Sequence, residues 1–86
     1  MDIFIERLKE MRLSRGMSQE KLAKETGLSQ SAIAFWEKGQ RVPNALAVIT
    51  LARYFGVSSD WLLGLEDWLR RRVVAQFRGY KHEVEN

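Results

Sequence analysis

The chain has 86 residues, which is enough for one small domain with a single compact core. Its 45% hydrophobic and 29% charged residues are typical of a globular protein, and its formal net charge of +3 permits nucleic-acid binding without demonstrating it. The absence of cysteine excludes a disulfide framework, a thiolate zinc site and a cysteine nucleophile, and the one histidine, His82, leaves almost no material for histidine-based chemistry.

Membrane proteins and enzymes are also poorly matched by the sequence. No apolar run approaches the roughly 18–20 residues of a membrane span, and Asp2 and Glu6 near the start argue against a signal peptide. There is no glycine-rich phosphate loop and no paired carboxylate set. We therefore expect a soluble cytoplasmic protein that is not an enzyme and that uses no metal and no cofactor.

Residues that end and begin helices occur at regular intervals. Glycine enters the left-handed conformation at a helix end without steric cost, and Ser or Asn caps the free N–H groups at a helix start. The candidate ends are Gly16, Gly27, Gly39, Gly56 and Gly64, and the candidate starts are Ser18, Ser29, Asn44 and Ser58. The segments between them predict five short helices, near 3–15, 19–26, 30–38, 45–55 and 59–63. No stretch alternates with the period of a strand, so the predicted fold class is all-α.

Each predicted helix carries apolar residues at helical spacing, which is typical of a face turned towards the core. In chain order they are Phe4, Leu8, Met11, Leu22, Ala23, Ile33, Trp36, Val48, Leu51, Ala52, Phe55, Trp61 and Leu62. This pattern predicts one core built from all five helices.

The predicted helices near 19–26 and 30–38 are joined by Gly27, Leu28 and Ser29. These supply a left-handed residue, an apolar plug and an N-cap, and so short a link makes the second helix cross the first at a steep angle. The small side chain of Ala23 lets the two helices approach closely. This is helix-turn-helix geometry, in which the second helix can enter a DNA major groove. Corners of two helices are common, so the turn alone is a weak signal.

Two longer stretches are more specific, SQEKLAKETGLSQSAIAFWEKGQRVP and LARYFGVSSDWLLG. They resemble the Cro/repressor-type (Xre-like) helix-turn-helix family of bacterial and phage transcriptional regulators over about residues 3–65. The resemblance implies a five-helix lambda-repressor-like DNA-binding domain over residues 1–65, with a recognition helix near 30–38 that lies in the major groove of double-stranded DNA. It also implies a cytoplasmic regulator that joins the nucleoid when bound, most simply a homodimeric repressor of a two-fold-symmetric operator.

Four residues on the outer side of the predicted recognition helix are candidates for reading base pairs. Gln30 suits an adenine edge, and Ser31 can donate to or accept from a base. Ala34 leaves room for close approach, and Phe35 can pack on a thymine methyl group. The resemblance places base contacts at Gln30, Ser31 and Phe35, although the family often has a polar residue at the last of these. The alternative is that Gln30 is an ordinary first-turn residue and that Phe35 packs on the C-terminal tail.

A second set of polar residues surrounds this helix and matches the family's contacts to the DNA backbone. The set consists of Gln19, Lys38, Gln40, Arg41 and Asn44. The resemblance also implies that Gln19 braces Gln30. The alternative is that these are solvated surface residues, and that Asn44 serves only as a helix cap.

One charged pair has a structural interpretation. Arg12 lies one turn beyond Leu8, and Glu37 lies one turn beyond Ile33, so each borders a face that is predicted to be buried. The resembled family pairs an Arg and a Glu at these places, which implies a partly buried, bidentate Arg12–Glu37 salt bridge.

Residues 66–86 lie beyond the resemblance and predict a C-terminal helical extension. A helix near 65–78 carries an apolar stripe that continues from Leu62; its members are Leu65, Leu69, Val73 and Phe77, with Trp68 at its edge. This stripe needs a partner, either helices of its own domain or a second subunit. We favour the dimer, because it sets two recognition helices one DNA turn apart, roughly 34 Å. The run Arg70-Arg71-Arg72 either touches DNA or forms a solvated face.

A rival hypothesis gives the extension a protein partner. The chain is then a protein-interaction module, such as an antitoxin that masks a toxin and binds its own promoter. An apolar extension left exposed in a dimer favours this hypothesis, whereas an extension used up by the dimer interface opposes it.

Overall fold

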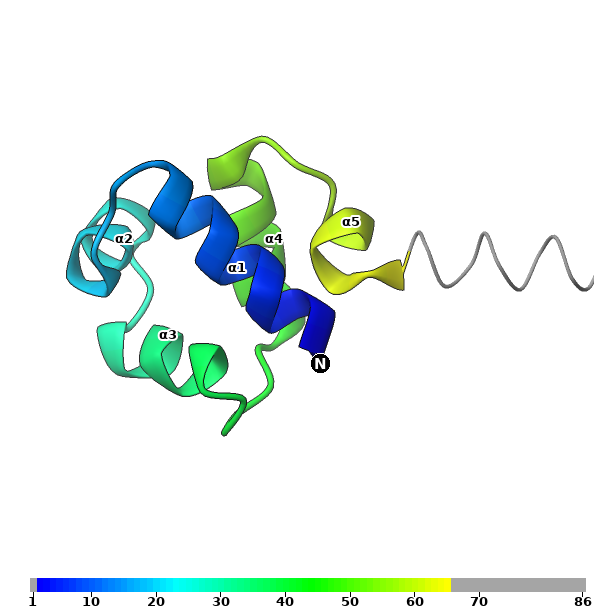
Figure 1. The fold of residues 1–86 in the computed structure, drawn as a ribbon, viewed down its shortest axis with the longest axis horizontal. Helices are drawn as coiled ribbons and strands as arrows, with labels where there is room; N and C mark the ends of the chain where they lie inside the picture. The colour runs from blue at the N-terminus through cyan, green and yellow to red at the C-terminus, as the bar shows by residue number, and fades with distance from the viewer. Residues whose placement is uncertain (1, 66–86) are drawn as a thin grey trace, which may run out of the picture.

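Five helices make up the part of the chain that the structure describes. The structure is a computed structural model, and it describes residues 2–65. Its elements are α1 (Asp2–Ser14), α2 (Gln19–Thr26), α3 (Gln30–Glu37), α4 (Ala45–Phe55) and α5 (Ser59–Leu63), with no strand among these residues (Figure 1). The all-α prediction is confirmed. The predicted helix near 65–78 lies outside the described residues, apart from Leu65.

The observed helix bounds follow local hydrogen bonds. α1 begins and ends one residue earlier than predicted and α3 ends one residue earlier, whereas the other three helices have the predicted bounds. The four N-cap side chains each accept a backbone N–H from three residues ahead, at 2.8–3.2 Å. They are Ser18, Ser29, Asn44 and Ser58. Each bond satisfies a donor that a helix start leaves free, which is why these positions fix the starts.

The core lies between the helices and takes side chains from all five. Its fully buried members are Phe4, Leu8, Leu22, Ile33, Leu51 and Leu62, and the helical pattern predicts every one of them. Met11, Ala23 and Trp61 pack against this core but are only partly buried. Met17 is buried too, although it lies in the turn between α1 and α2, where the helical pattern predicts no core residue.

The layout is organised around α1, which contacts both α3 and α5. In Figure 1, α1 runs across the domain, with α2 and α3 towards one end and α5 towards the other. α2 packs on α3 and α4, and α4 packs on α5. Within residues 2–65, no helix has the length and apolar character needed to cross a membrane. The arrangement sets α3 at an edge of the domain.

The end of α5 approaches α1 closely at Gly64. Gly64 is the C-cap of α5 with φ of 75°, and a Cβ at this position would lie 2.8 Å from both Cδ1 and Cγ2 of Ile3. Gly56, the C-cap of α4, has a similar φ of 70°, but its Cβ position faces open space. A substitution at Gly56 therefore tests the backbone conformation alone, whereas a substitution at Gly64 tests the conformation together with the close contact to Ile3.

We expect Gly64→Ala to lower the free energy of unfolding more than Gly56→Ala does. The left-handed backbone costs an alanine about 1–2 kcal/mol at either position, and the contact with Ile3 adds about 1–3 kcal/mol at position 64. Urea unfolding followed by circular dichroism measures both losses. Adding Ile3→Ala to Gly64→Ala should recover part of the difference, because it removes the two closest atoms. Equal losses at the two glycines would contradict the packing contribution.

Candidate nucleic-acid interface

The corner between α2 and α3 is built from the three residues that link them. Gly27 is the C-cap of α2 with φ of 76°, and its N–H donates to the carbonyl of Ala23. Leu28 packs against the core, and its N–H donates to Thr26 Oγ1 at 3.3 Å. Ser29 caps α3. α2 and α3 therefore meet at a short corner and pack on each other, as helix-turn-helix geometry requires.

One side of α3 is anchored in the domain. Ile33, Trp36 and Glu37 are buried. The rings of Trp36 and Phe4 meet edge to face, with centroids 6.5 Å apart and planes at 74°. This geometry is favourable for an aromatic pair, so it fixes the C-terminal half of α3 against α1.

The candidate base-reading residues lie away from that anchored side. Gln30 and Ser31 are exposed at the N-terminal end of α3, whereas Ala34 and Phe35 are half-buried. The first turn of a recognition helix is the part that reaches base edges. The exposure of Gln30 and Ser31 means that an outside molecule can reach this end of α3.

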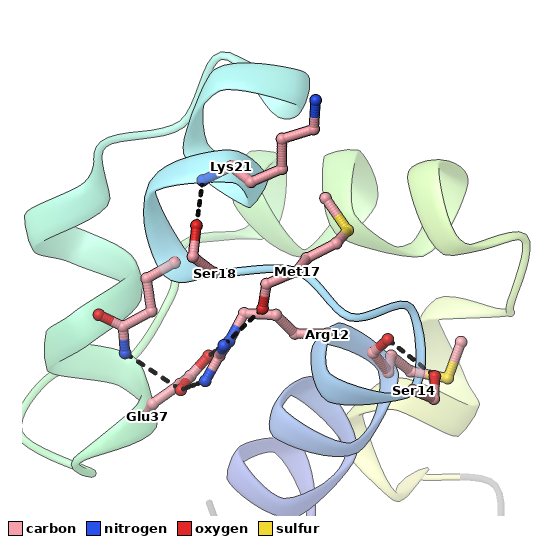
Figure 2. Close-up of polar contacts among 8 residues, drawn as sticks. Arg12, Ser14, Met17, Ser18, Lys21 and Glu37 are labelled. Atoms are coloured by element: carbon pink, nitrogen blue, oxygen red, sulfur yellow. Dashed lines mark hydrogen bonds and ion pairs between the residues drawn. The ribbon is translucent and has the colours of Figure 1, made fainter.

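A buried ion pair joins α1 to the C-terminal end of α3 (Figure 2). Arg12 Nε donates to Glu37 Oε2 at 2.7 Å and Arg12 Nη2 donates to Glu37 Oε1 at 2.8 Å, so the pair is bidentate. The two side chains are 12% and 3% exposed. Arg12 Nη1 also donates to the carbonyl of Met17 at 2.7 Å, which ties in the turn before α2. The hydrogen bond to Glu37 raises the pKa of Arg12 above its ordinary value, against the opposing effect of burial.

Gln19 binds the same carboxylate from α2. Its Nε2 donates to Glu37 Oε1 at 3.1 Å, so three helices meet at Glu37. This bond holds the amide of Gln19 at the end of α3 opposite to Gln30, and the brace from Gln19 to Gln30 that the resemblance implies stays a prediction. The physical reason is that a buried carboxylate has several lone pairs to satisfy, and the amide of Gln19 supplies a donor.

The turn after α3 carries the remaining polar candidates. Gly39 has φ of 74°, its N–H donates to the carbonyl of Trp36 at 3.0 Å, and Gln40 N–H donates to the carbonyl of Phe35 at 2.9 Å. These two bonds form a Schellman motif, which reverses the chain at a helix end. The exposed polar residues in and after it are Lys38, Gln40, Arg41 and Asn44.

Two of these residues have partners within the domain. Asn44 Oδ1 accepts the N–H of Ala47 at 2.8 Å, so Asn44 does act as the N-cap of α4. The guanidinium carbon of Arg41 lies 4.6 Å from the ring centre of Phe35. Helical spacing does not predict this second contact. The sequence signal for it is Gly39, because a glycine just after a helix end reverses the chain.

Most of the predicted dimer residues lie outside the part of the chain that the structure describes. These are Trp68, Leu69, Val73 and Phe77. Leu65 is described, and it is 37% exposed. Val42 and Leu46, each 71% exposed, are apolar residues close in sequence to Arg41 and Asn44 that the sequence reasoning did not single out. In residues 2–65, no group of three or more His, Cys, Asp or Glu side chains is placed to hold a metal ion.

Comparison with known proteins finds helix-turn-helix regulators. Residues 8–62 match the profile of a helix-turn-helix family. The HTH-type transcriptional activator BcrR of Enterococcus faecalis is 34% identical over 64 residues, which cover 74% of this chain and 31% of that protein. The uncharacterized HTH-type transcriptional regulator YobD of Bacillus subtilis is 31% identical over 65 residues, which cover 76% of this chain and 58% of that protein.

A third relative is matched over most of its own length. It is an uncharacterized HTH-type transcriptional regulator of Archaeoglobus fulgidus, 36% identical over 61 residues, which cover 71% of this chain and 87% of that protein. By contrast, the matched segment spans about a third of the Enterococcus protein and just over half of the Bacillus one. The likeness is therefore strongest for the helix-turn-helix domain itself.

We expect the Arg12–Glu37 pair to be strongly coupled in stability. Arg12→Ala leaves a buried carboxylate without its main partner and should lower the free energy of unfolding by about 3–5 kcal/mol. In a double-mutant cycle with Glu37→Ala, the double variant should lose clearly less than the sum of the two single losses. Urea unfolding gives all three values.

The control for this cycle is Lys9→Ala, which removes an exposed cation from the same helix and should change stability by less than about 0.5 kcal/mol. Because the pKa of Arg12 is raised in the folded domain, the coupling should persist at neutral and moderately alkaline pH. It should be lost only as the pH rises through that raised pKa. Strictly additive losses would contradict the assignment.

Proposed function

The chain belongs to the helix-turn-helix family of DNA-binding transcription regulators, and from this premise we propose that it reads a specific DNA sequence with α3 in the major groove. We further propose that it is a homodimeric repressor of a two-fold-symmetric operator, acting in the cytoplasm and on the nucleoid when bound. Residues 1–65 bind DNA in this proposal, and residues 66–86 provide the subunit contact.

The observation that carries the proposal is the division of α3 into an anchored side and a free side. Ile33, Trp36 and Glu37 are buried, while Gln30 and Ser31 at the first turn are exposed. A helix that is rigidly held and free at its N-terminal end can place side chains against base edges without reorganising the domain. Gln30 then binds an adenine edge through its amide, and Ser31 donates to or accepts from the neighbouring base. Ala34 allows the helix to approach closely.

Polar residues around the C-terminal end of α3 support a docked orientation. α3 has eight residues and is therefore about 12 Å long, which is close to the roughly 12 Å width of the major groove. When the first turn reaches the base edges, polar residues beside the C-terminal end of the helix come within reach of the phosphates that line the groove. We assign backbone contacts to Gln19, Lys38, Gln40, Arg41 and Asn44. Such contacts fix the register of the helix without reading sequence.

The small size of a half-site supports the proposed dimer. One copy of the corner reads only a few base pairs, and two-fold pairing sets two recognition helices about 34 Å apart on one face of DNA. Leu65, which is 37% exposed at the end of the described residues, is the first member of the proposed subunit contact. An operator occupied in this way is closed to polymerase, which gives repression. The Enterococcus relative carries the name of an activator, so the sign of regulation is measured together with the binding.

We expect Gln30→Ala and Arg41→Ala to have different effects on DNA binding. Selection of duplexes from a random pool supplies the operator, and binding to it and to a scrambled duplex is measured at several salt concentrations. Gln30→Ala should weaken operator binding by about 1–3 kcal/mol and leave the scrambled duplex almost unchanged. Arg41→Ala should weaken both and reduce the salt slope by about 1.

A control that loses the same charge as Arg41→Ala separates a specific contact from a general loss of positive charge. Lys9→Ala removes one exposed cation outside the proposed interface and should bind both duplexes nearly as the unmodified protein does. Equal losses on both duplexes for Gln30→Ala would make Gln30 a backbone contact instead of a base-reading residue. An unmodified protein with no preference for any selected duplex would overturn sequence-specific readout.

We expect two copies of the chain on each operator. Sedimentation of the full chain at micromolar concentration, alone and with the selected duplex, measures the stoichiometry, and the selected sequences should contain two inverted half-sites about one helical turn apart. A reporter gene behind the operator should be repressed. A monomer in the presence of DNA would overturn the dimer, and raised transcription would overturn the repressor assignment.

A further inference from the structure

Phe35 is an aromatic side chain at a position of α3 where the resembled family often has a polar residue. The ring is half-buried on the outer part of α3, and one of its faces is covered by the guanidinium of Arg41 at 4.6 Å from the ring centre. We propose that Phe35 is a positioning residue that acts through Arg41, holding its guanidinium flat so that the N–H groups face a DNA phosphate. This inference rests on the proposed function, in which α3 lies in a major groove.

The backbone after α3 is shaped to bring the two side chains together. Gln40 N–H donates to the carbonyl of Phe35 at 2.9 Å, so the chain is bonded back to this residue just before Arg41. Gly39 makes the reversal with φ of 74°, and a Cβ at Gly39 would lie 3.1 Å from Cδ1 of Ile5. A larger residue at position 39 would therefore be crowded by Ile5, and the bond from Gln40 to Phe35 sets where the chain leaves the turn, just before Arg41.

Other stacked arginines in the domain show what is different about Arg41. Arg7 lies 4.4 Å above the ring of Trp61 and donates to the carbonyl of that residue. Arg15 lies 5.0 Å above the ring of Phe55 and donates to its carbonyl at 3.1 Å. Both therefore direct N–H groups to helix-end carbonyls inside the domain, which is a structural role.

Arg41 makes no such bond. Among residues 2–65, its guanidinium has a ring partner but neither a hydrogen-bond acceptor nor a carboxylate. Arg41 is also exposed. Its planar set of donors is therefore oriented by the aromatic face and left open for an acceptor outside the domain.

The acceptor that fits is a backbone phosphate. A guanidinium binds two phosphate oxygens through parallel N–H groups, and fixing its plane beforehand reduces the freedom that is lost on binding. Arg41 lies beyond the C-terminal end of α3, whereas base edges are reached by the first turn of a recognition helix. Phe35 thus contributes to docking on any sequence, and the expected thymine contact of its ring becomes the competing outcome.

The test measures binding of the full chain to the selected operator and to a scrambled duplex. Phe35→Leu removes the aromatic face and keeps an apolar side chain, and we expect it to weaken binding to both duplexes by about two- to fivefold, the range of a surface cation–π contact. Phe35→Tyr keeps the face and should bind as the unmodified protein does. In the Arg41→Ala background, Phe35→Leu should cause no further loss and no further change in the salt slope.

A second variant keeps the test decisive if Phe35→Leu disturbs folding, which urea unfolding detects. Arg41→Lys keeps the charge and leaves Phe35 intact but lacks the planar fork of donors, so it should lose affinity on both duplexes. Affinity in Arg41→Lys equal to that of the unmodified protein would overturn the proposal.

The remaining outcomes separate this inference from the proposed function. If Phe35→Leu lost affinity only for the operator, or if the affinity losses of the Phe35 and Arg41 variants were independent, the positioning role would be overturned. Phe35 would then be assigned a direct base contact, and the proposal of DNA binding would be unaffected. Failure of the unmodified protein to prefer any selected duplex would overturn sequence-specific readout itself. In that case, coupling between Phe35 and Arg41 on the scrambled duplex would still support the positioning role.

Discussion

The buried carboxylate of Glu37 is the constraint on which the rest of the described domain depends. A charge removed from water is costly unless it is paired and hydrogen-bonded, and Glu37 is met by Arg12 from α1 and by Gln19 from α2. Arg12 reaches further to the carbonyl of Met17, so the turn between these helices is included. A carboxylate held from two helices fixes the rotation of α3 about its own axis. The same contact therefore decides which residues of α3 face outwards.

The two ends of α3 depend on different local structures. Its start is set by Ser29 as N-cap and by Leu28 packed against the core, and these determine where Gln30 stands. Its end is set by the reversal at Gly39, which determines where Arg41 stands. In the proposed complex, reading of bases belongs to the first end and docking on the DNA backbone belongs to the second. Substitutions at one end can therefore alter one property and spare the other.

Local chemistry explains which parts of the structure the sequence predicts. The helix starts are encoded by capping residues such as Ser18 and Ser58, whose bonds reach only three residues along the chain. The buried apolar residues follow from helical spacing, and the Arg12–Glu37 pair was implied by the family resemblance and is present in the structure. These features were predictable because each depends on residues close in sequence or on a motif of the family.

The features that sequence reasoning missed depend on the path of the chain in three dimensions. The amide of Gln19 is bonded to Glu37 because the buried carboxylate lies within its reach, which spacing along the chain does not reveal. Met17 is buried because the turn before α2 folds over the core. The stacking of Arg41 on Phe35 depends on the exact course of the turn after α3. The assignment of individual residues to bases or phosphates stays a prediction, because it depends on a partner molecule.

The shortness of α3 has a consequence for how the domain opens. A helix of eight residues does not persist alone in water, since nucleation is costly and few bonds repay it. α3 keeps its shape because Phe4 and Arg12 of α1 hold its inner side and α2 packs beside it. We therefore expect a fluctuation that detaches α1 to unfold α3 as well, so that the two helices exchange their amide hydrogens as one cooperative unit. The surface assigned to DNA should therefore have the same stability against unfolding as the core beneath it, and it should be lost when that core unfolds.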